Sequence, residues 1–248
     1  MILDTHWAPP PATMSIPERG EVHVWRLDLA REANPVWLET LSADERARAD
    51  RFRFPHDRHS FASTRGAMRS LLGQYLGVAP QSLELIAGPF GKPTLTAEQN
   101  ARRITFNVTH SGGYALLAFA CGDAVGVDLE QMTATRDLEP SAAMVLSPAE
   151  LQRFQETVST GRELFFLRAW TAKEAIVKAL GGGLSIPLHR IEIEPGSGEE
   201  IFFRAPGIAD TSGWSVLNLN AQDSYVAALA VMVRAERVRL WTCVPGPV

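Results

Sequence analysis

The sequence predicts an α+β protein that is built from two similar halves. The predicted elements run as a strand, helices and strands, and then as helices and strands again. A length of 248 residues suits one large domain or two medium ones. An apolar fraction of 46% and a charged fraction of 21% are typical of a globular protein. We therefore divide the chain into a proline-rich arm over residues 1–20, an N-terminal half over 21–122 and a C-terminal half over 123–248.

The N-terminal half begins, after the arm, with a strand and two helices. Apolar residues alternate from Glu21 to Leu29, which predicts the first strand. Ser42 followed by Glu45 forms a capping-box pattern that opens a short helix. A longer helix is expected over about residues 57–76, because apolar residues recur there at helical spacing and Gly77 follows.

Short strands and turns follow, before the pattern repeats. Strands are expected over residues 104–108, 114–120 and 124–130, and the last two are expected to form a hairpin across Gly122. Ser147 before Pro148 marks another helix start, and a long apolar helix is expected over about residues 162–180, before three glycines. The remaining predicted strands lie at 200–204, 214–219, 225–233 and 237–243.

Composition excludes several classes of protein. A formal charge of −4 and a pI near 5.9 argue against a dedicated nucleic-acid binder. Cys121 and Cys243 are far apart and have no neighbouring ligand residues, which favours a reduced, cytoplasmic protein without structural zinc. No signal peptide or membrane-spanning run is expected. Basic residues nevertheless gather in one stretch that could hold a small polyanion: Arg46, Arg48, Arg51, Arg53, Arg58, Arg65 and Arg69.

Two carboxylates share one face of a predicted strand. In the segment G-V-D-L-E, Asp128 and Glu130 point to the same side because side chains alternate along a strand. Neighbouring carboxylates repel each other unless a cation lies between them, and Mg²⁺ is commonly held by one or two carboxylates together with phosphate oxygens. An edge strand with a solvated acidic face would explain the same pattern.

A third carboxylate lies on the long apolar helix. Trp170, Glu174 and Lys178 are spaced four residues apart and therefore share one stripe. Glu174 and Lys178 could form an ordinary surface ion pair. The rest of the helix is apolar nearly all round, however, which predicts burial, and buried charges need partners such as a metal and a phosphate.

Two further segments contain groups that could bind an anion. His110 ends a predicted strand beside two glycines, where exposed backbone N–H groups could form an anion nest. Lys92 lies in the turn Phe90-Gly91-Lys92-Pro93. A histidine that caps a strand and a plain β-turn with an exposed lysine are the alternatives for these two segments.

Taken together, the four segments resemble the 4'-phosphopantetheinyl transferase superfamily, specifically its surfactin-synthetase-activating type. The motifs are G-K-P at residues 91–93, N-V-T-H-S at 107–111, G-V-D-L-E at 126–130 and W-T-A-K-E-A-I-V-K-A-L-G-G-G-L at 170–184. The resemblance extends to the arginine-rich helix that ends at Arg51-Phe52 and covers most of residues 40–190. Each motif alone is weak, but the ordered set is specific.

The resemblance implies an activity and a set of site residues. Members of the family move the phosphopantetheine arm of coenzyme A to a serine of a carrier protein and release 3',5'-ADP. By resemblance, Asp128, Glu130 and Glu174 bind Mg²⁺, and Glu174 and Lys178 are catalytic. The expected coenzyme A contacts are Arg48, Gly91, Lys92, Pro93, Asn107, Thr109, His110, Asp128 and Lys178, with Arg65 either a further contact or an ion pair that holds its helix.

The family also implies where the site lies and what it meets. The active site is expected at the interface of the two halves, in a monomer that acts on acyl, peptidyl or aryl carrier proteins of fatty-acid, polyketide or nonribosomal peptide synthesis. Residues 131–144, which directly follow the acidic strand, are a candidate carrier surface or an ordinary connector. Two other functions could use the same residues, namely hydrolysis of nucleotide pyrophosphates and non-catalytic binding of coenzyme A.

Overall fold

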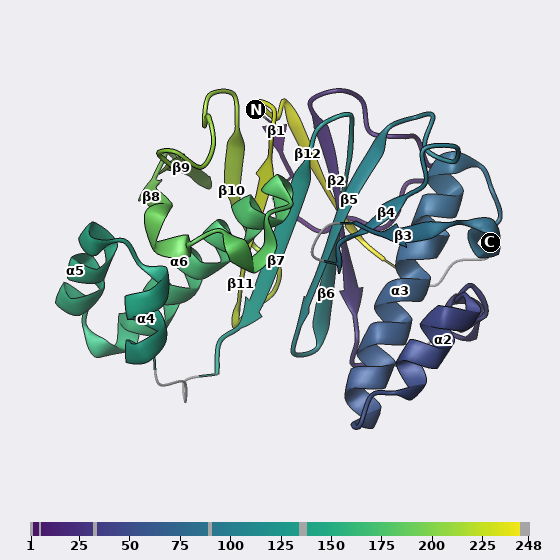
Figure 1. The fold of residues 1–248 in the computed structure, drawn as a ribbon, viewed down its shortest axis with the longest axis horizontal. Helices are drawn as coiled ribbons and strands as arrows, with labels where there is room; N and C mark the ends of the chain where they lie inside the picture. Colours follow the sequence, from purple (N-terminus) through teal and green to yellow (C-terminus); the bar gives the residue numbers. More distant parts are fainter. Residues whose placement is uncertain (1, 5, 32–33, 89–90, 134–137, 244–248) are drawn as a thin grey trace.

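A computed structural model describes residues 2–4, 6–31, 34–88, 91–133 and 138–243, and these form four layers in the order helix, sheet, sheet, helix (Figure 1). Helix α3 (Pro55–Leu76) packs on the outer face of the first sheet through Met68 and Leu72. Helix α6 (Ser159–Leu180) packs on the outer face of the second sheet. The inner faces of the two sheets pack against each other in a core of aliphatic side chains. The predicted α+β fold in two halves is confirmed.

The first sheet has five strands in the order β1-β12-β2-β6-β5. Their bounds are β1 Ile2–Leu3, β2 Glu21–Asp28, β5 Ile104–Ser111, β6 Tyr114–Cys121 and β12 Arg237–Thr242. Strand β12 runs parallel to both β1 and β2, whereas β6 runs antiparallel to its two neighbours, β2 and β5. The last described strand, β12, therefore belongs to the sheet of the N-terminal half. A division at residue 123 assigns β7 to β11 correctly to the second sheet, but it places β12 in the wrong half.

The second sheet has five antiparallel strands in the order β7-β11-β10-β9-β8. Their bounds are β7 Val125–Gln131, β8 Glu192–Pro195, β9 Glu200–Arg204, β10 Ser215–Leu219 and β11 Tyr225–Val231. The predicted hairpin between β6 and β7 is wrong, because β6 pairs with β5 and β2 whereas β7 pairs with β11. Gly122, with φ +81°, turns the chain from one sheet into the other.

The helices begin and end largely where their capping residues predict. The remaining helices are α1 Pro35–Glu39, α2 Ala43–Asp50, α4 Glu139–Val145 and α5 Pro148–Glu156, with short 3-10 turns at Pro80–Ser82, Gly183–Ser185 and Leu188–Arg190. Ser42 and Ser147 each form a complete capping box. Gly77 and Gly181 end α3 and α6 in the left-handed conformation.

A two-stranded hairpin of β3 (Leu85–Ala87) and β4 (Pro93–Leu95) connects α3 to the first sheet. Within the part of the chain that the structure describes, no helix combines the length and the apolar character needed to cross a bilayer.

Candidate active site

The site lies where the edge strands β5 and β7 of the two sheets meet. These strands are joined by side chains, not by a ladder of backbone hydrogen bonds. Asn107 Oδ1 accepts a hydrogen bond from the backbone N–H of Val127 at 2.9 Å. Two residues further along β5, the Thr109 hydroxyl donates to Asp128 Oδ1 at 3.1 Å. Asn107 and Thr109, expected from the resemblance to line the coenzyme A pocket, therefore bind the strand that bears the acidic residues.

Ser111 continues this row of polar side chains and was not singled out from the sequence. Its hydroxyl donates to Glu130 Oε2 at 3.2 Å and accepts the backbone N–H of Gln131 at 3.1 Å. Because Asn107, Thr109 and Ser111 are two residues apart, they share one face of β5. Strand alternation was the signal that could have identified Ser111.

The predicted direction of the two acidic side chains on β7 is confirmed. Val127 and Leu129 lie in the core between the sheets, so the alternating side chains of Asp128 and Glu130 face the other way, towards α6. Asp128 is 5% exposed, and its Oδ1 lies 2.6 Å from Lys178 Nζ. Burial raises the pKa of Asp128, Lys178 opposes that shift, and Glu130 adds to it.

Glu174 faces the same charges from α6, one helical turn before Lys178. Burial raises the pKa of Glu174, the Asp128 carboxylate raises it further, and the Lys178 ammonium lowers it. The three predicted carboxylates, Asp128, Glu130 and Glu174, are thus brought into one electrostatic environment. Glu130 disfavours the ionised forms of Asp128 and Glu174, and Lys178 is the cation that favours both.

The residues present fit a divalent cation. Asp128 Oδ2 is buried and has no hydrogen-bond partner, which leaves one carboxylate oxygen available to a ligand. No three His, Cys, Asp or Glu side chains of the described residues are already gathered as a metal-binding group. Asp128, Glu130 and Glu174 are the residues that would hold such a cation, and its charge would offset the repulsion among the three carboxylates.

Gly126 explains how β7 and α6 approach each other so closely. A β-carbon at this position would clash with the backbone oxygen of Ala175 and would lie 2.6 Å from the backbone nitrogen of Ala179. Only glycine allows the strand to pack directly on the helix backbone. The glycine of the G-V-D-L-E motif thus sets the distance between Asp128 and the helix that bears Glu174.

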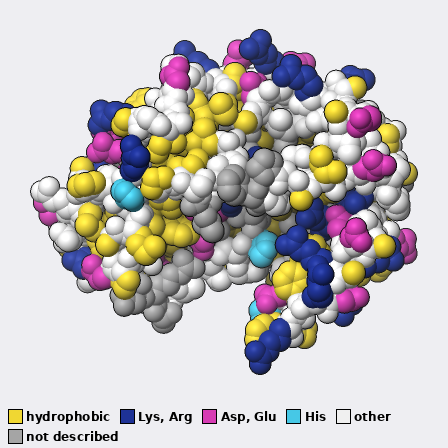
Figure 2. Space-filling model, in the orientation of Figure 1, with side chains coloured by type: hydrophobic (Ala, Val, Ile, Leu, Met, Phe, Trp, Pro, Cys, Tyr) yellow, Lys and Arg dark blue, Asp and Glu magenta, His cyan; other side chains and the backbone are white. Residues whose placement is uncertain are grey.

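A basic pocket opens beside this seam, on the N-terminal half. It has a volume of about 240 Å³, and its lining includes Arg48, Phe61, Arg65, Gly91, Pro93 and His110. The guanidinium carbons of Arg48 and Arg65 lie 5.0 Å and 5.7 Å from the centre of the Phe61 ring. Burial lowers the pKa of His110, as does Lys178. Figure 2 shows Lys and Arg side chains gathered beside a His side chain, next to the hollow between the two halves.

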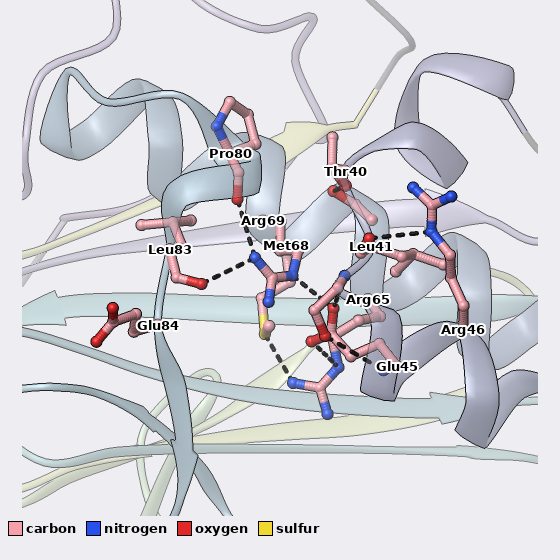
Figure 3. A network of polar contacts seen from close by, with 12 residues as sticks. Thr40, Leu41, Glu45, Arg46, Arg65, Met68, Arg69, Pro80, Leu83 and Glu84 are labelled. Carbon is pink, nitrogen blue, oxygen red and sulfur yellow. Dashed lines mark hydrogen bonds and ion pairs between the residues drawn. The ribbon is translucent and has the colours of Figure 1, made fainter.

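An ion-pair network holds the helices that form this pocket (Figure 3). Glu45 Oε2 accepts a hydrogen bond from Arg69 Nε at 2.6 Å, and Glu45 Oε1 lies 3.4 Å from Arg65 Nε. Arg69 also donates to the backbone oxygens of Pro80 and Leu83, at 2.9 Å and 3.1 Å. Arg65 therefore forms the helix ion pair considered from the sequence and also lines the pocket. Glu45 was predicted only as a helix-capping residue, and its ion pair with Arg69 was not predicted.

The ammonium group of Lys92, a residue expected to contact a phosphate, lies in the seam between the two halves. Its Nζ donates to the backbone oxygens of Val125 and Lys178, at 3.1 Å and 2.9 Å. The sequence-predicted residues thus separate into two groups. Arg48, Gly91, Pro93 and His110 line the pocket, whereas Lys92, Asn107 and Thr109 join the N-terminal half to β7 and α6.

Comparison with known proteins identifies the family. The N-terminal model of 4'-phosphopantetheinyl transferases matches residues 30–122, and the model of the 4'-phosphopantetheinyl transferase superfamily matches residues 124–230. The 4'-phosphopantetheinyl transferase HetI of Nostoc sp. is 35% identical over 243 residues, covering 97% of this chain and 99% of the relative. The chain belongs to the 4'-phosphopantetheinyl transferase superfamily. The predicted enzyme class is confirmed.

Two further relatives show how the similarity is distributed. A putative 4'-phosphopantetheinyl transferase of Synechocystis sp. is 32% identical, and the match covers 84% of this chain and 85% of the relative. A 4'-phosphopantetheinyl transferase of Bacillus subtilis is 27% identical, and the match covers 63% of this chain and 67% of the relative. The Nostoc and Synechocystis proteins thus match along more of the chain than the Bacillus protein does.

Proposed function

We propose that this transferase moves the 4'-phosphopantetheine of coenzyme A to a serine hydroxyl of a carrier protein, with Mg²⁺ held by Asp128, Glu130 and Glu174, and releases 3',5'-ADP. The observation that carries the proposal is the unpartnered buried oxygen of Asp128, a carboxylate that interacts electrostatically with Glu174 in a seam beside a basic pocket. When bound, Mg²⁺ would neutralise charge on the pyrophosphate.

The basic pocket suits the nucleotide end of coenzyme A. Arg48 and His110 supply hydrogen-bond donors and positive potential for phosphate groups. Gly91 and Pro93 offer a surface without long side chains against which a flat base can pack. The pocket volume of about 240 Å³ accommodates only part of the cofactor, so the remainder of coenzyme A would extend along the seam toward Asp128.

Lys178 and Glu174 are proposed to act at the pyrophosphate of coenzyme A and at the incoming serine hydroxyl, respectively. Lys178 Nζ lies beside Asp128, where it can donate to an oxygen of the pyrophosphate. Burial and neighbouring carboxylates raise the pKa of Glu174 in the metal-free protein, so this carboxylate retains affinity for a proton. Glu174 is therefore our candidate to accept the proton of the serine hydroxyl, directly or through a water molecule.

The arrangement of the two halves bears on the type of transferase and on its oligomeric state. Both walls of the site come from one chain, which supports the surfactin-synthetase-activating type acting as a monomer on acyl, peptidyl or aryl carriers. Part of the candidate carrier surface at residues 131–144 lies outside the described residues. Within its described part, Met144 is 74% exposed and could contact a carrier.

The test compares Asp128→Asn with Asp123→Asn, a matched change in the turn before β7. Wild-type protein with coenzyme A, Mg²⁺ and an apo carrier is expected to add the mass of phosphopantetheine to the carrier. Asp128→Asn should lose transfer about 100-fold or more, whereas Asp123→Asn should keep it. Mg²⁺ should raise the unfolding temperature of the wild type in the presence of coenzyme A, and Asp128→Asn should remove that increase.

Two outcomes would contradict the proposal. Accumulation of 3',5'-ADP without any mass gain on a panel of apo carriers would indicate a hydrolase. Full transfer by Asp128→Asn would exclude this carboxylate as a metal ligand.

A further inference from the structure

Lys92 connects the N-terminal half to two elements of the C-terminal half. It directly precedes β4, yet its ammonium group donates to the oxygen of Val125, the first residue of β7, and to the oxygen of Lys178 in the last turn of α6. Lys178 O is among the last four carbonyls of a helix, which lack a partner within the helix. A cation at this end also interacts favourably with the helix dipole.

The same two elements carry the reacting groups. Lys178 Nζ donates to Asp128 Oδ1 at 2.6 Å and to the backbone oxygen of Val127 at 3.2 Å. Lys92 therefore bonds the main chain of Lys178, and the side chain of Lys178 in turn bonds Asp128. Movement of the last turn of α6 along β7 would change both contacts together.

The use of lysine in this protein is unusually restricted. The chain contains 21 arginines but only three lysines, Lys92, Lys173 and Lys178. Each of the three donates to at least one backbone oxygen and lies on or beside α6. An ammonium group is a compact donor of three hydrogen bonds, whereas a guanidinium is a planar fork. Lysine thus occurs where one small cation bonds two oxygens of neighbouring elements.

The surroundings of Lys92 agree with a role in the protein interior. Burial lowers its pKa to about 8, and the nearby charge of Lys178 lowers it as well. Both hydrogen bonds of its Nζ within the described residues go to neutral backbone oxygens.

We propose that Lys92 is a positioning residue, which aligns the last turn of α6 with β7 and acts on the reaction through the main chain of Lys178, in place of the phosphate contact that the family resemblance implies. The activity part of this inference rests on the proposed function. The alignment of α6 with β7 can be followed by amide hydrogen exchange without any substrate.

The test uses Lys92→Met and Lys92→Arg, with Arg48→Gln as the comparison for a pocket residue. Lys92→Met is expected to lower kcat about 10–100-fold, as second-sphere changes do, and to change the Kd of 3',5'-ADP less than about threefold. Amide hydrogen exchange should accelerate at Ala179–Gly182 and at the start of β7. Arg48→Gln should give the opposite pattern, a raised Kd with exchange rates as in the wild type.

The Lys92→Arg variant keeps the positive charge at residue 92 but changes the geometry of its hydrogen bonds. If Lys92 positions α6, the arginine variant should also show faster exchange in these segments and a lower kcat, because the planar fork cannot replace the two ammonium bonds. If Lys92 only supplies positive potential to a phosphate, the arginine variant should behave like the wild type, which would overturn the inference.

The remaining outcomes are also decisive. A Lys92→Met protein that weakens 3',5'-ADP as much as Arg48→Gln does, with unchanged exchange, would assign Lys92 to the phosphate. If Lys92→Met does not fold, the arginine variant carries the exchange test alone. A wild type that never modifies any carrier would refute the proposed function, and the exchange comparison would still decide the role of Lys92.

Discussion

Gly126 lies where β7 contacts both the core between the sheets and the backbone of α6. Its neighbours Val127 and Asp128 face opposite sides of β7, so the strand must satisfy the core between the sheets and the acidic site at once. The absence of a side chain at Gly126 is what lets α6 lie close enough for Lys178 to reach Asp128.

We expect Gly126→Ala to destabilise the fold by about 2–3 kcal/mol, because a β-carbon would overpack the contact with α6. Transfer activity should fall with it, since Glu174 and Lys178 would move away from β7. The measurement is a denaturant-unfolding midpoint with a parallel transfer assay.

Gly113→Ala provides the matched control. A β-carbon there would meet only the Tyr225 hydroxyl, at 3.7 Å, so a change of less than about 1 kcal/mol is expected. Equal unfolding midpoints for the two variants would show that the backbone approach at Gly126 is not the constraint.

At the scale of elements, a buried ion pair attaches α6 to the helices beside it. Lys173 is fully buried, pairs with Glu150 of α5 and donates to the backbone oxygen of Val145 of α4 at 2.8 Å. Glu150 also accepts the backbone N–H of Ile193 in β8 at 2.8 Å and caps α5 at Ser147. The lysine next to Glu174 in the family motif is therefore a structural residue that joins four elements.

Lys173→Met should destabilise the protein by about 3–5 kcal/mol, because Glu150 would remain buried without its cation. Arg204→Met is the control, since Arg204 pairs with Glu194 at the surface and its side chain is 65% exposed. That control should cost less than about 1 kcal/mol.

The double variant Lys173→Met with Glu150→Gln should recover part of the loss, since the glutamine carries no charge to desolvate. Urea unfolding of the four proteins measures these differences. A Lys173→Met variant as stable as the wild type would contradict the structural role.

At the scale of the whole molecule, the sheet that joins the two ends of the chain contains a buried histidine. His23 of β2 is 2% exposed, and its Nδ1 lies 2.9 Å from the Tyr75 hydroxyl. Burial lowers its pKa from 6.5 to about 4, while Glu21 opposes the shift and Arg239 adds to it. The folded protein therefore keeps this imidazole neutral at pH values where an unfolded chain would protonate it.

Stability should consequently fall as the pH decreases from 6.5 to 4, because the unfolded state binds a proton that the folded state does not. At pH 5 the loss relative to neutral pH amounts to about 2 kcal/mol. His23→Asn should flatten this dependence, whereas His56→Asn, at an exposed site, should not. Parallel pH profiles of unfolding for His23→Asn and the wild type would contradict the prediction.

Local chemistry made most of the elements predictable. Serine caps, Pro148 and the terminal glycines mark where the helices begin and end, and alternation on β7 correctly orients the acidic side chains. These signals act within a few residues, so a single sequence contains them in full.

Long-range pairing was not predictable in the same way. Nothing in the neighbourhood of Gly122 tells whether β7 folds back on β6 or crosses to β11, and the hairpin prediction failed for that reason. The destinations of Lys92 and Asn107 depend on how the two sheets meet, which only the complete fold determines. Family motifs identified these residues as important but did not specify what they bind.

The parallel pairing of β2 with β12 has a consequence for how the protein is made. Glu21 pairs with Arg237, 216 residues later (237 − 21). At a synthesis rate of about 5–20 residues per second, β12 is therefore made roughly 10–40 s after β2. During that time the newly made chain presents an open strand edge bearing Val22 and Val24, which the finished protein buries completely. Yield in a cell therefore depends on keeping that edge from pairing with other chains, and slower translation would lengthen the exposure.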